Sequence, residues 1–340
     1  MTEEIYRQPR TPSSSGSETR RTCQVLDPKE NLKSGFRPAM VFFHFQVRAT
    51  GSCVPSHSTL FHLLISMFEI VWICFTCTCL LIYVFSPYIG FLSTHGKMAP
   101  NSPKANHSLH SSHQKGDIIQ RWLSTFSQLT VKKGYFGHFY VLGTIISLYC
   151  LSYEFLHASI PFFSNSKLQV LFLFSIQCIR RGLECSLASF GQSKLHISAY
   201  IVGLLHYLFI PIAILNFPSQ NCSPSRSLMA WAIFSLGSYV QTCAHESLRQ
   251  LKLQQLSTGR YSVPKNFPFF YICCPHYTAE ICIYAALTSY YPFNNEMVLV
   301  FLWVVSNLSV VADEQLRWYW NKFKEDIPNP NWKRLIPFVW

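Results

Sequence analysis

The chain has 340 residues, of which 49% are hydrophobic, 16% aromatic and only 13% charged, and its formal net charge is +12. Soluble domains carry about 25% charged residues, so this composition argues against an ordinary soluble domain, and it excludes a disordered or collagen-like chain. No two of the 14 glycines are separated by a single residue. A G-x-G-x-x-G fingerprint is therefore missing, which argues against a soluble Rossmann dehydrogenase.

The N-terminal segment 1–58 contains many Ser, Arg and Pro residues around the low-complexity run SSSGS at 13–17. This composition predicts a disordered tail, followed by a membrane-embedded domain over 59–340. The first long apolar run begins only near Leu60. We therefore expect that run to act as a membrane anchor and not as a cleaved leader.

Apolar runs close to the 20 residues that cross about 30 Å of hydrocarbon recur along the rest of the chain. They predict an all-α fold, a polytopic membrane bundle of six or seven transmembrane helices, because the last two runs are short. The predicted ranges are 60–86, 136–156, 168–190, 197–217, 228–244, 275–291 and 297–312.

Cysteine and histidine are frequent, but their placement does not predict a metal site. Many of the 13 cysteines lie inside apolar runs, and the C-x-x-C pair Cys74 and Cys77 sits within the first span without a second pair of ligands in a polar loop. We interpret these cysteines as apolar filler. The loop 93–120 holds four histidines in a low-complexity setting that has no scaffold to fix them.

Lys and Arg are distributed unevenly between the two sides of a seven-span topology. Beyond the N-terminal tail and the spans themselves, only Lys167 and Arg226 fall on one side. The positive-inside rule then places the loops 91–135 and 245–274 and the C-terminal tail in the cytosol. The positive charge is thus a signal of topology and of anion binding, with no nucleic acid and no obligate protein partner inferred.

Polar residues at helical spacing mark candidate sites, because charges inside a bilayer usually face an internal cavity. Gln241, His245 and Arg249 are four residues apart, on one stripe that either descends from a phosphate-binding mouth or is a wetted helix end. His276 and Glu280 are also four apart. The Glu280 carboxylate either accepts hydrogen bonds from a cofactor's ribose or carboxamide, or is a helix N-terminal acid favoured by the dipole.

Three further features have both a structural and a functional interpretation. Arg180 and Glu184 in the third span are four apart, which favours a pair that neutralises itself. His138 is either a satisfied helix histidine or a proton donor to a substrate oxygen. The basic, aromatic loop that contains Arg260 and Tyr261 suits either an anionic cofactor with planar rings or lipid head groups.

Several segments carry a family resemblance over about residues 130–340. The ending, RWYWNKFKEDIP at 317–328 with LIPF at 335–338, resembles that of the steroid 5-alpha-reductase family, and PHYTAE at 275–280 is similar to its P-N-Y-x-x-E. The segments KGYFGHFY at 133–140 and RRGLEC at 180–185, together with Gln241-x-x-x-His245, resemble the polyprenal (polyprenol) reductase branch of that family.

The resemblance implies an all-helical enzyme of the endoplasmic reticulum membrane that uses NADPH to reduce a double bond conjugated to a carbonyl. For this branch the implied substrate is the α-isoprene unit of a long polyprenoid, and the implied pathway supplies dolichol for protein N-glycosylation. His138 falls on the position that faces the substrate oxygen, with Tyr140 as a second candidate. The cofactor residues, from position or spacing, are Gln241, His245, Arg249, Arg260, Tyr261, His276, Glu280 and Tyr319.

The chain departs from the family pattern at three positions. His276 stands where the family has Asn, Leu316 where it has His, and Ser262 where it usually has Arg, a loss for which Arg260 can substitute. Three rival functions stay open: a 3-oxo-steroid 5-alpha-reductase, a membrane lipid methyltransferase and a non-enzymatic lipid-binding or transport protein. The last would spread polar residues through several midplanes, whereas here they gather in the cytosolic half.

Overall fold

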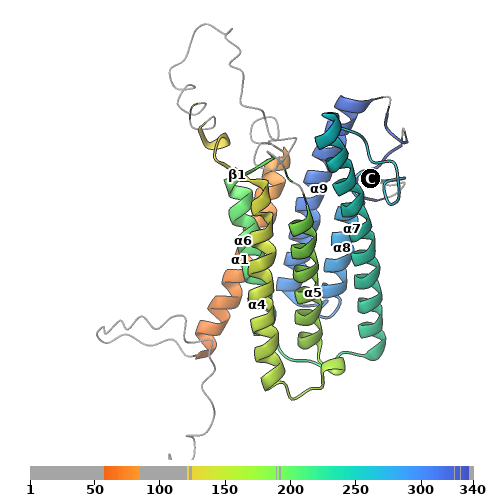
Figure 1. The fold of residues 1–340 in the computed structure, drawn as a ribbon. Helices are drawn as coiled ribbons and strands as arrows, with labels where there is room; N and C mark the ends of the chain where they lie inside the picture. The colour runs from red at the N-terminus through yellow and green to blue at the C-terminus, as the bar shows by residue number, and fades with distance from the viewer. Residues whose placement is uncertain are drawn as a thin grey trace, which may run out of the picture. The chain divides into compact units, whose positions relative to one another are not determined.

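The computed structural model describes residues 57–84, 121, 125–188, 190, 193–324, 326–329 and 331–336. The predicted disordered tail lies outside the described residues except for its last two positions, and so does the histidine-rich loop 93–120. Within the described ranges the structure is almost entirely helical (Figure 1), as predicted for an all-α fold.

Each of the predicted apolar ranges coincides for most of its described length with a helix. Two of these helices, α7 and α9, continue well beyond the apolar runs into polar sequence. The helices are α1 (His57–Val84), α4 (Phe136–His157), α5 (Ser166–Leu187), α6 (Ile197–Asn216), α7 (Pro224–Thr258), α8 (Pro275–Thr288) and α9 (Asn295–Phe323), with 3-10 turns at Lys133–Tyr135 and Phe162–Ser164.

Four helical segments of the described chain are long and apolar enough to cross a membrane. They are Met67–Val84, Lys133–His157, Ile197–Asn216 and Asn295–Phe323. The prediction of six or seven spans is therefore confirmed only as a polytopic helical fold. Two of the three remaining helices fall short for local reasons: α5 carries charges near its end, and the 14 residues of α8 are only about 21 Å long at 1.5 Å per residue.

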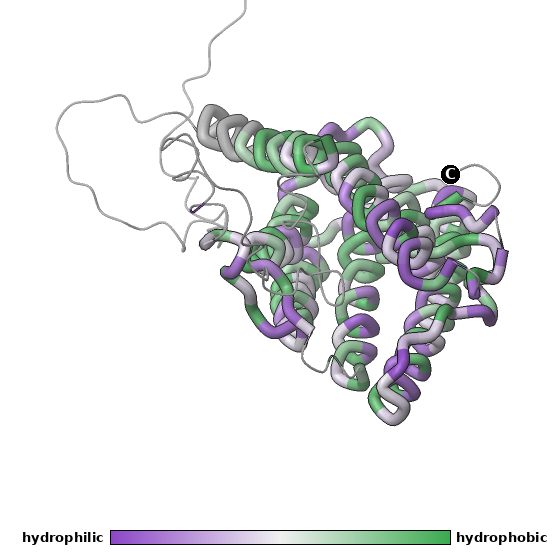
Figure 2. Tube along the Cα trace, turned by 90° about the horizontal axis from the view of Figure 1, so that it is seen from above, coloured by the Kyte–Doolittle hydropathy of each residue, from purple (hydrophilic) through white to green (hydrophobic). Residues whose placement is uncertain are grey.

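Large apolar side chains cover the outer surface of several helices, as expected where lipid and not water is the neighbour. Figure 2 shows hydrophobic residues along most of the helical tubes, with hydrophilic residues denser on the right, the side of α7 and α9 in Figure 1. Exposed examples are Met67, Ile70, Leu81, Val141, Ile145, Tyr149, Leu228, Leu236 and Tyr239.

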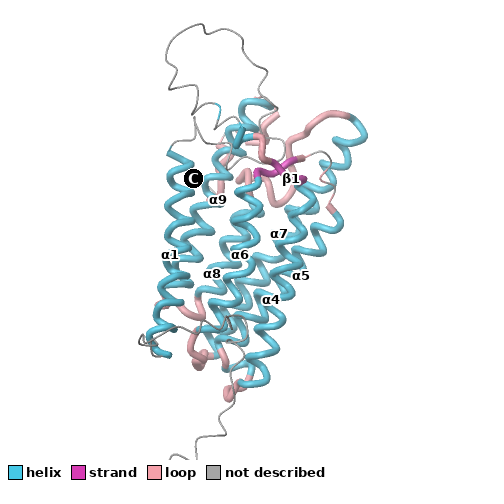
Figure 3. The backbone as a smooth tube through the Cα atoms, turned by 90° about the vertical axis from the view of Figure 1, so that its left-hand side faces the viewer, coloured by secondary structure: helices cyan, strands magenta, loops and turns pink. Residues whose placement is uncertain are grey.

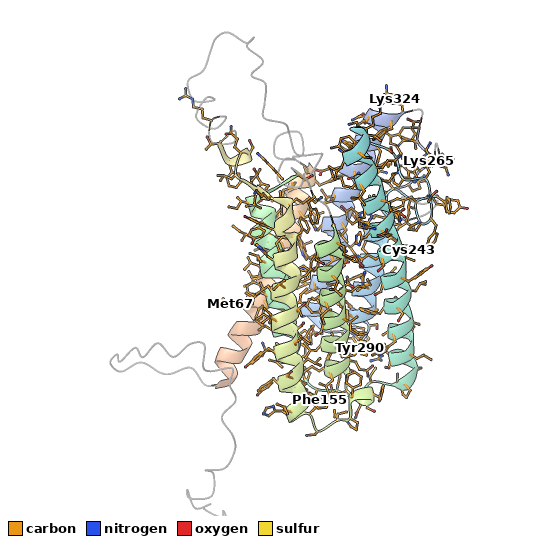
Figure 4. All side chains as sticks on the ribbon, viewed as in Figure 1. Met67, Phe155, Cys243, Lys265, Tyr290 and Lys324 are labelled. Carbon is orange, nitrogen blue, oxygen red and sulfur yellow. The ribbon has the colours of Figure 1, made fainter. Side chains whose placement is uncertain are left out.

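The helices run alternately up and down (Figure 1), with α7 packed on α8, α4 on α5 and α6, and α1 on α9. Consecutive loops therefore lie at opposite ends of the bundle. In Figure 4, Lys265 and Lys324 lie at the upper end, whereas Phe155 and Tyr290 lie towards the lower end. This arrangement agrees with the predicted separation of the basic loops from the rest.

A two-stranded sheet and a set of ion pairs connect the chain segments at the upper end of the bundle. Strands β1 (Thr130–Lys132) and β2 (Lys194–His196) pair antiparallel and tie the start of α4 to the start of α6 (Figure 3). The C-terminal segment is held by Asp313 of α9, which is 1% exposed and forms ion pairs with Arg317 and Arg334. These contacts fix the helix ends around which the cavity described below is built.

Helix α6 approaches α4 closely at Gly203. A Cβ atom at this position would lie 2.7 Å from Cζ of Phe139, whose side chain is 4% exposed and cannot easily move away. Gly137 on α4, by contrast, has nothing within 4 Å of its ideal Cβ.

We therefore expect Gly203→Ala to lower the free energy of unfolding by about 1–3 kcal/mol, because the added methyl overpacks the helix contact. Gly137→Ala should raise it slightly, because alanine has the higher helix propensity. Thermal unfolding of the two variants in detergent tests this difference. Equal melting temperatures would contradict the close contact between α4 and α6.

Candidate active site

A cavity of about 660 Å³ opens between α4, α5, α6, α7, α8 and α9. This volume is within the range typical of ligand pockets, about 300–1,000 Å³. One side of the cavity is polar and is built by α5, α7 and α8. The other side is formed mainly by aromatic and aliphatic side chains, among them Phe139, Val202, Tyr207, Trp303, Val304 and Leu308.

Glu280 is the central carboxylate of the polar side. Helix α8 begins with Pro275 at its first turn, and Glu280 follows about one and a half turns later. Its Oε2 accepts hydrogen bonds from Gln177 Nε2, at 3.0 Å, and from Gln241 Nε2. In the described part of the chain, no donor lies within hydrogen-bonding distance of Oε1. The carboxylate is thus held by two amides, with one oxygen left for a ligand.

The two arginines of α5 share a single carboxylate, that of Glu184. Arg180 Nη1 and Arg181 Nη1 each bind a different oxygen of this group. The predicted pairing of Arg180 with Glu184 is therefore confirmed, and it extends further than the spacing indicated. Arg180 Nη2 also donates to Gln177 Oε1 at 2.6 Å and to Gln241 Oε1, which links the ion cluster to the amides around Glu280.

Helices α7 and α4 contribute further polar side chains that bind the arginines and Glu184. His245 Nδ1 lies 2.7 Å from Glu184 Oε2, and Thr242 Oγ1 donates to Glu184 Oε1 at 2.8 Å. Arg181 Nη2 donates to Tyr140 Oη at 3.2 Å, and its guanidinium carbon lies 5.1 Å from the centroid of that ring. The two arginines balance the carboxylates of Glu184 and Glu280, so this cluster of four charged groups has no net formal charge.

A second group of polar side chains lies on the apolar side. Trp303 Nε1 of α9 donates to Nδ1 of His206 of α6 at 3.2 Å, and Nε2 of the same histidine lies 2.7 Å from Tyr284 Oη of α8. The Tyr284 side chain is 1% exposed and that of His206 is 8% exposed. All three residues line the cavity.

Cations and aromatic rings gather where α7 and α9 extend beyond the apolar part of the bundle. Lys322 Nζ lies 4.1 Å from the Tyr261 ring centroid, and Lys252 Nζ lies 5.9 Å from it. Arg249 donates to the Glu246 carboxylate through Nε at 2.7 Å and Nη2 at 2.8 Å. Hydrogen bonds from Arg249 and Gln250 hold the pKa of Glu246 below its usual range, so this pair is ionised.

Most of the residues singled out from the sequence line the same cavity. Among the candidate site residues the two exceptions are His138 and Arg260, both of which are exposed. The residues that line the cavity are Tyr140, Gln241, His245, Arg249, Tyr261, His276, Glu280 and Tyr319.

His138 does not line the cavity. Its Nδ1 is 2.8 Å from Tyr200 Oη, and its ring stacks on that of Tyr135 with 4.9 Å between the ring centroids. The structure therefore favours the interpretation of a satisfied helix histidine. The reason is the helical period: residues two apart point about 200° away from each other, so His138 and Tyr140 cannot both face inward.

Three lining or supporting residues did not emerge from the sequence. Gln177 is a polar residue within an apolar run, three positions before Arg180, and that spacing was a signal that could have found it. His206 lies in the most apolar of the predicted spans and has no charged neighbour in sequence. Trp303 meets it from 97 residues away, a contact that no local pattern predicts.

Comparison with known proteins gives one family. Residues 198–340 match the profile of the family described as 3-oxo-5-alpha-steroid 4-dehydrogenase. Similar proteins include the polyprenal reductase of Saccharomyces cerevisiae, 32% identical over 221 residues, which are 64% of this chain and 78% of that protein. The polyprenal reductase of Drosophila melanogaster is 25% identical over 294 residues, 74% of this chain and 88% of that protein. That of Caenorhabditis elegans is 25% identical over 258 residues, with coverage of 64% and 82%.

Proposed function

Because this chain belongs to the steroid 5-alpha-reductase family, in its polyprenal reductase branch, we propose that it reduces the α-isoprene double bond of a polyprenal with NADPH. The product is a precursor of dolichol for protein N-glycosylation. The observation that carries the proposal is the Glu280 carboxylate, which two glutamine amides hold in a cavity with one oxygen left for a ligand.

The residues of the polar side fit a nicotinamide dinucleotide. A carboxylate and an amide suit the carboxamide of the nicotinamide, and cations beside aromatic rings suit phosphates and an adenine. We assign Glu280 and Gln241 to the nicotinamide half. The residues assigned to the remainder of the cofactor are His245, His276 and Tyr319 in the cavity, and Arg249, Lys252, Arg260, Tyr261 and Lys322 at its mouth.

The apolar side of the cavity suits the isoprene chain. Phe139, Tyr207 and Leu308 present aromatic and aliphatic surface, and the outer faces of the helices are apolar as well. A polyprenyl chain partitions into lipid and does not cross water. The substrate therefore enters from the bilayer, whereas the cofactor enters at the basic end.

The proposed reaction requires no covalent bond between the protein and the substrate. When bound, the reduced nicotinamide supplies a hydride to the β carbon of the enal. The cavity orients the enal and donates a hydrogen bond to the carbonyl oxygen, where negative charge develops in the transition state. Two lining hydroxyls are held in place by neighbouring side chains and could act as this donor. Arg181 holds the hydroxyl of Tyr140, and His206 holds that of Tyr284.

Purified protein with NADPH and a polyprenal tests the proposal, with mass spectrometry locating the added hydrogens at the α-isoprene unit. A 3-oxo-steroid and S-adenosylmethionine serve as competing substrates in parallel reactions. Reduction of the steroid alone would favour the steroid reductase function, and methyl transfer would favour the methyltransferase function. Binding of the polyprenal without turnover would leave a lipid-binding protein.

We place the protein in the endoplasmic reticulum membrane because of its family, and its C-terminus in the cytosol because of the unequal distribution of Lys and Arg. In intact microsomes a C-terminal tag should be accessible to protease. Asn221, which begins the sequon Asn221-Cys222-Ser223 at the opposite end of the bundle, should face the lumen. A protected tag, or a glycan on Asn106, would contradict this orientation.

A further inference from the structure

The hydrogen bonds around His206 fix where its proton lies. An indole N–H is only a donor, so the 3.2 Å contact with Trp303 Nε1 requires His206 Nδ1 to be the acceptor. The proton of the neutral imidazole then sits on Nε2, which lies 2.7 Å from Tyr284 Oη. His206 is therefore the donor to Tyr284, and the hydroxyl proton of Tyr284 must be donated elsewhere.

The Tyr284 hydroxyl can donate its hydrogen bond only to an acceptor in the cavity. Among the described residues, none accepts a hydrogen bond from its hydroxyl, and the side chain lines the cavity. Tyr284 follows Glu280 by four residues on α8, so both lie on one face of the helix, about 6 Å apart along its axis. The hydroxyl is thus a buried donor one turn beyond the carboxylate assigned to the nicotinamide.

We propose that Tyr284 is the catalytic residue that donates a hydrogen bond to the carbonyl oxygen of the substrate, and that His206 and Trp303 position its hydroxyl. This inference rests on the proposed reduction of an enal. In a nicotinamide the carboxamide is attached next to the carbon that carries the hydride. In an enal the oxygen is two carbons from the β carbon. If Glu280 holds the carboxamide, the enal oxygen lies near enough to be reached from the next turn of α8, where Tyr284 stands.

The reduction adds one hydride and one proton to the double bond, the first from the cofactor and the second from water. The β carbon gains the hydride from the reduced nicotinamide, the former double-bond electrons move towards the carbonyl, and charge grows on the oxygen that Tyr284 contacts. A proton from water then completes the α carbon, which restores the carbonyl of the saturated aldehyde. The donation from His206 makes the Tyr284 hydroxyl a stronger donor, because linked hydrogen bonds polarise one another.

Tyr284→Phe keeps the ring and removes the hydroxyl, so kcat should fall by about 10²- to 10³-fold, the usual loss for one oxyanion donor. The KM for NADPH should not change. Tyr290→Phe is the matched control: Tyr290 is equally buried, its hydroxyl donates to Gln169 at 2.9 Å, and it does not line the cavity. It should keep the kcat of the unmodified protein.

A second measurement reports the hydrogen bond without turnover. Farnesal labelled with ¹³C at the aldehyde carbon, bound together with NADP⁺, should show a lower infrared carbonyl frequency than free farnesal in the same detergent. The shift should disappear in Tyr284→Phe. It should become smaller in Trp303→Phe, which keeps Tyr284 but removes the indole donor that holds the His206 proton on Nε2. Trp303→Phe leaves the Tyr284 hydroxyl in place. If Tyr284→Phe does not fold, the carbonyl shift in Trp303→Phe still tests the proposal.

The outcomes separate this inference from the proposed function. If the unmodified protein reduces no enal, the proposed function itself fails. If it reduces an enal while Tyr284→Phe keeps both kcat and the carbonyl shift, only the inference is overturned. Loss of the shift in Tyr140→Phe in place of Tyr284→Phe would assign the donor to the hydroxyl held by Arg181, and an unchanged shift in Trp303→Phe would overturn the positioning role of that residue.

Discussion

Glu280→Gln is expected to raise the KM for NADPH or to lower kcat by about 10- to 150-fold, the kinetic equivalent of losing a charged hydrogen bond of ~1.5–3 kcal/mol. The amide has nearly the shape of the carboxylate but lacks its charge, and it places an N–H₂ where two glutamine donors already point. The affinity for the polyprenoid should change little. Steady-state kinetics with varied NADPH, at saturating polyprenal, measures the effect.

Glu296→Gln is a suitable control for this substitution. Glu280 is half-buried, and Glu296 is a buried carboxyl at 3% exposure that lies at the start of α9 and does not line the proposed cofactor cavity. Its replacement should leave the kinetics with NADPH unchanged. If Glu280→Gln unfolds the protein while the folded fraction binds NADPH normally, then Glu280 is a structural residue and the cofactor site lies elsewhere.

Glu184→Gln should give the largest loss of stability. The carboxylate is shared by Arg180 and Arg181, whose side chains are 19% and 13% exposed, so its removal leaves two largely buried guanidinium groups without the carboxylate that both of them bind. Breaking a buried ion pair on one side costs about 3–5 kcal/mol. A lower melting temperature in detergent, read by intrinsic fluorescence, measures the effect.

Two further variants test the cause of that loss. Glu246→Gln breaks the exposed pair with Arg249 and should leave the melting temperature unchanged, since exposed pairs contribute little. Adding Arg181→Met to Glu184→Gln removes one of the unpaired charges and should recover part of the stability. If the double variant is less stable than the single one, the shape of the cluster matters more than its charge.

The positions of the helices were predictable, because each depends on a long apolar run. Their lengths were not. Helix α7 continues past 244 because its sequence has no breaker before Gly259, which ends the helix at a φ of 71°. Hydropathy marks only the part of such a helix that meets lipid. The extension matters for function, since it carries His245 and Arg249 to the cavity.

The site was predictable where it depends on spacing within one helix. Gln241 with His245 and His276 with Glu280 lie on common faces, and all four line the cavity. Spacing could not decide which of two nearby residues faces inward, as with His138. The meeting of α6, α8 and α9 around the Tyr284 hydroxyl depends on tertiary packing, which leaves no trace in any single stretch of sequence.

The short rise between Glu280 and Tyr284 has a consequence for how the two reactants reach each other. The polar side of the cavity leads towards the basic loops, and its other side is lined by the same kinds of residue that cover the lipid-facing helices. A water-soluble reductant and a bilayer-dissolved aldehyde would then never share a solvent. Their reacting ends would meet along a single helical turn of α8, so that turn would act as the boundary between the two phases.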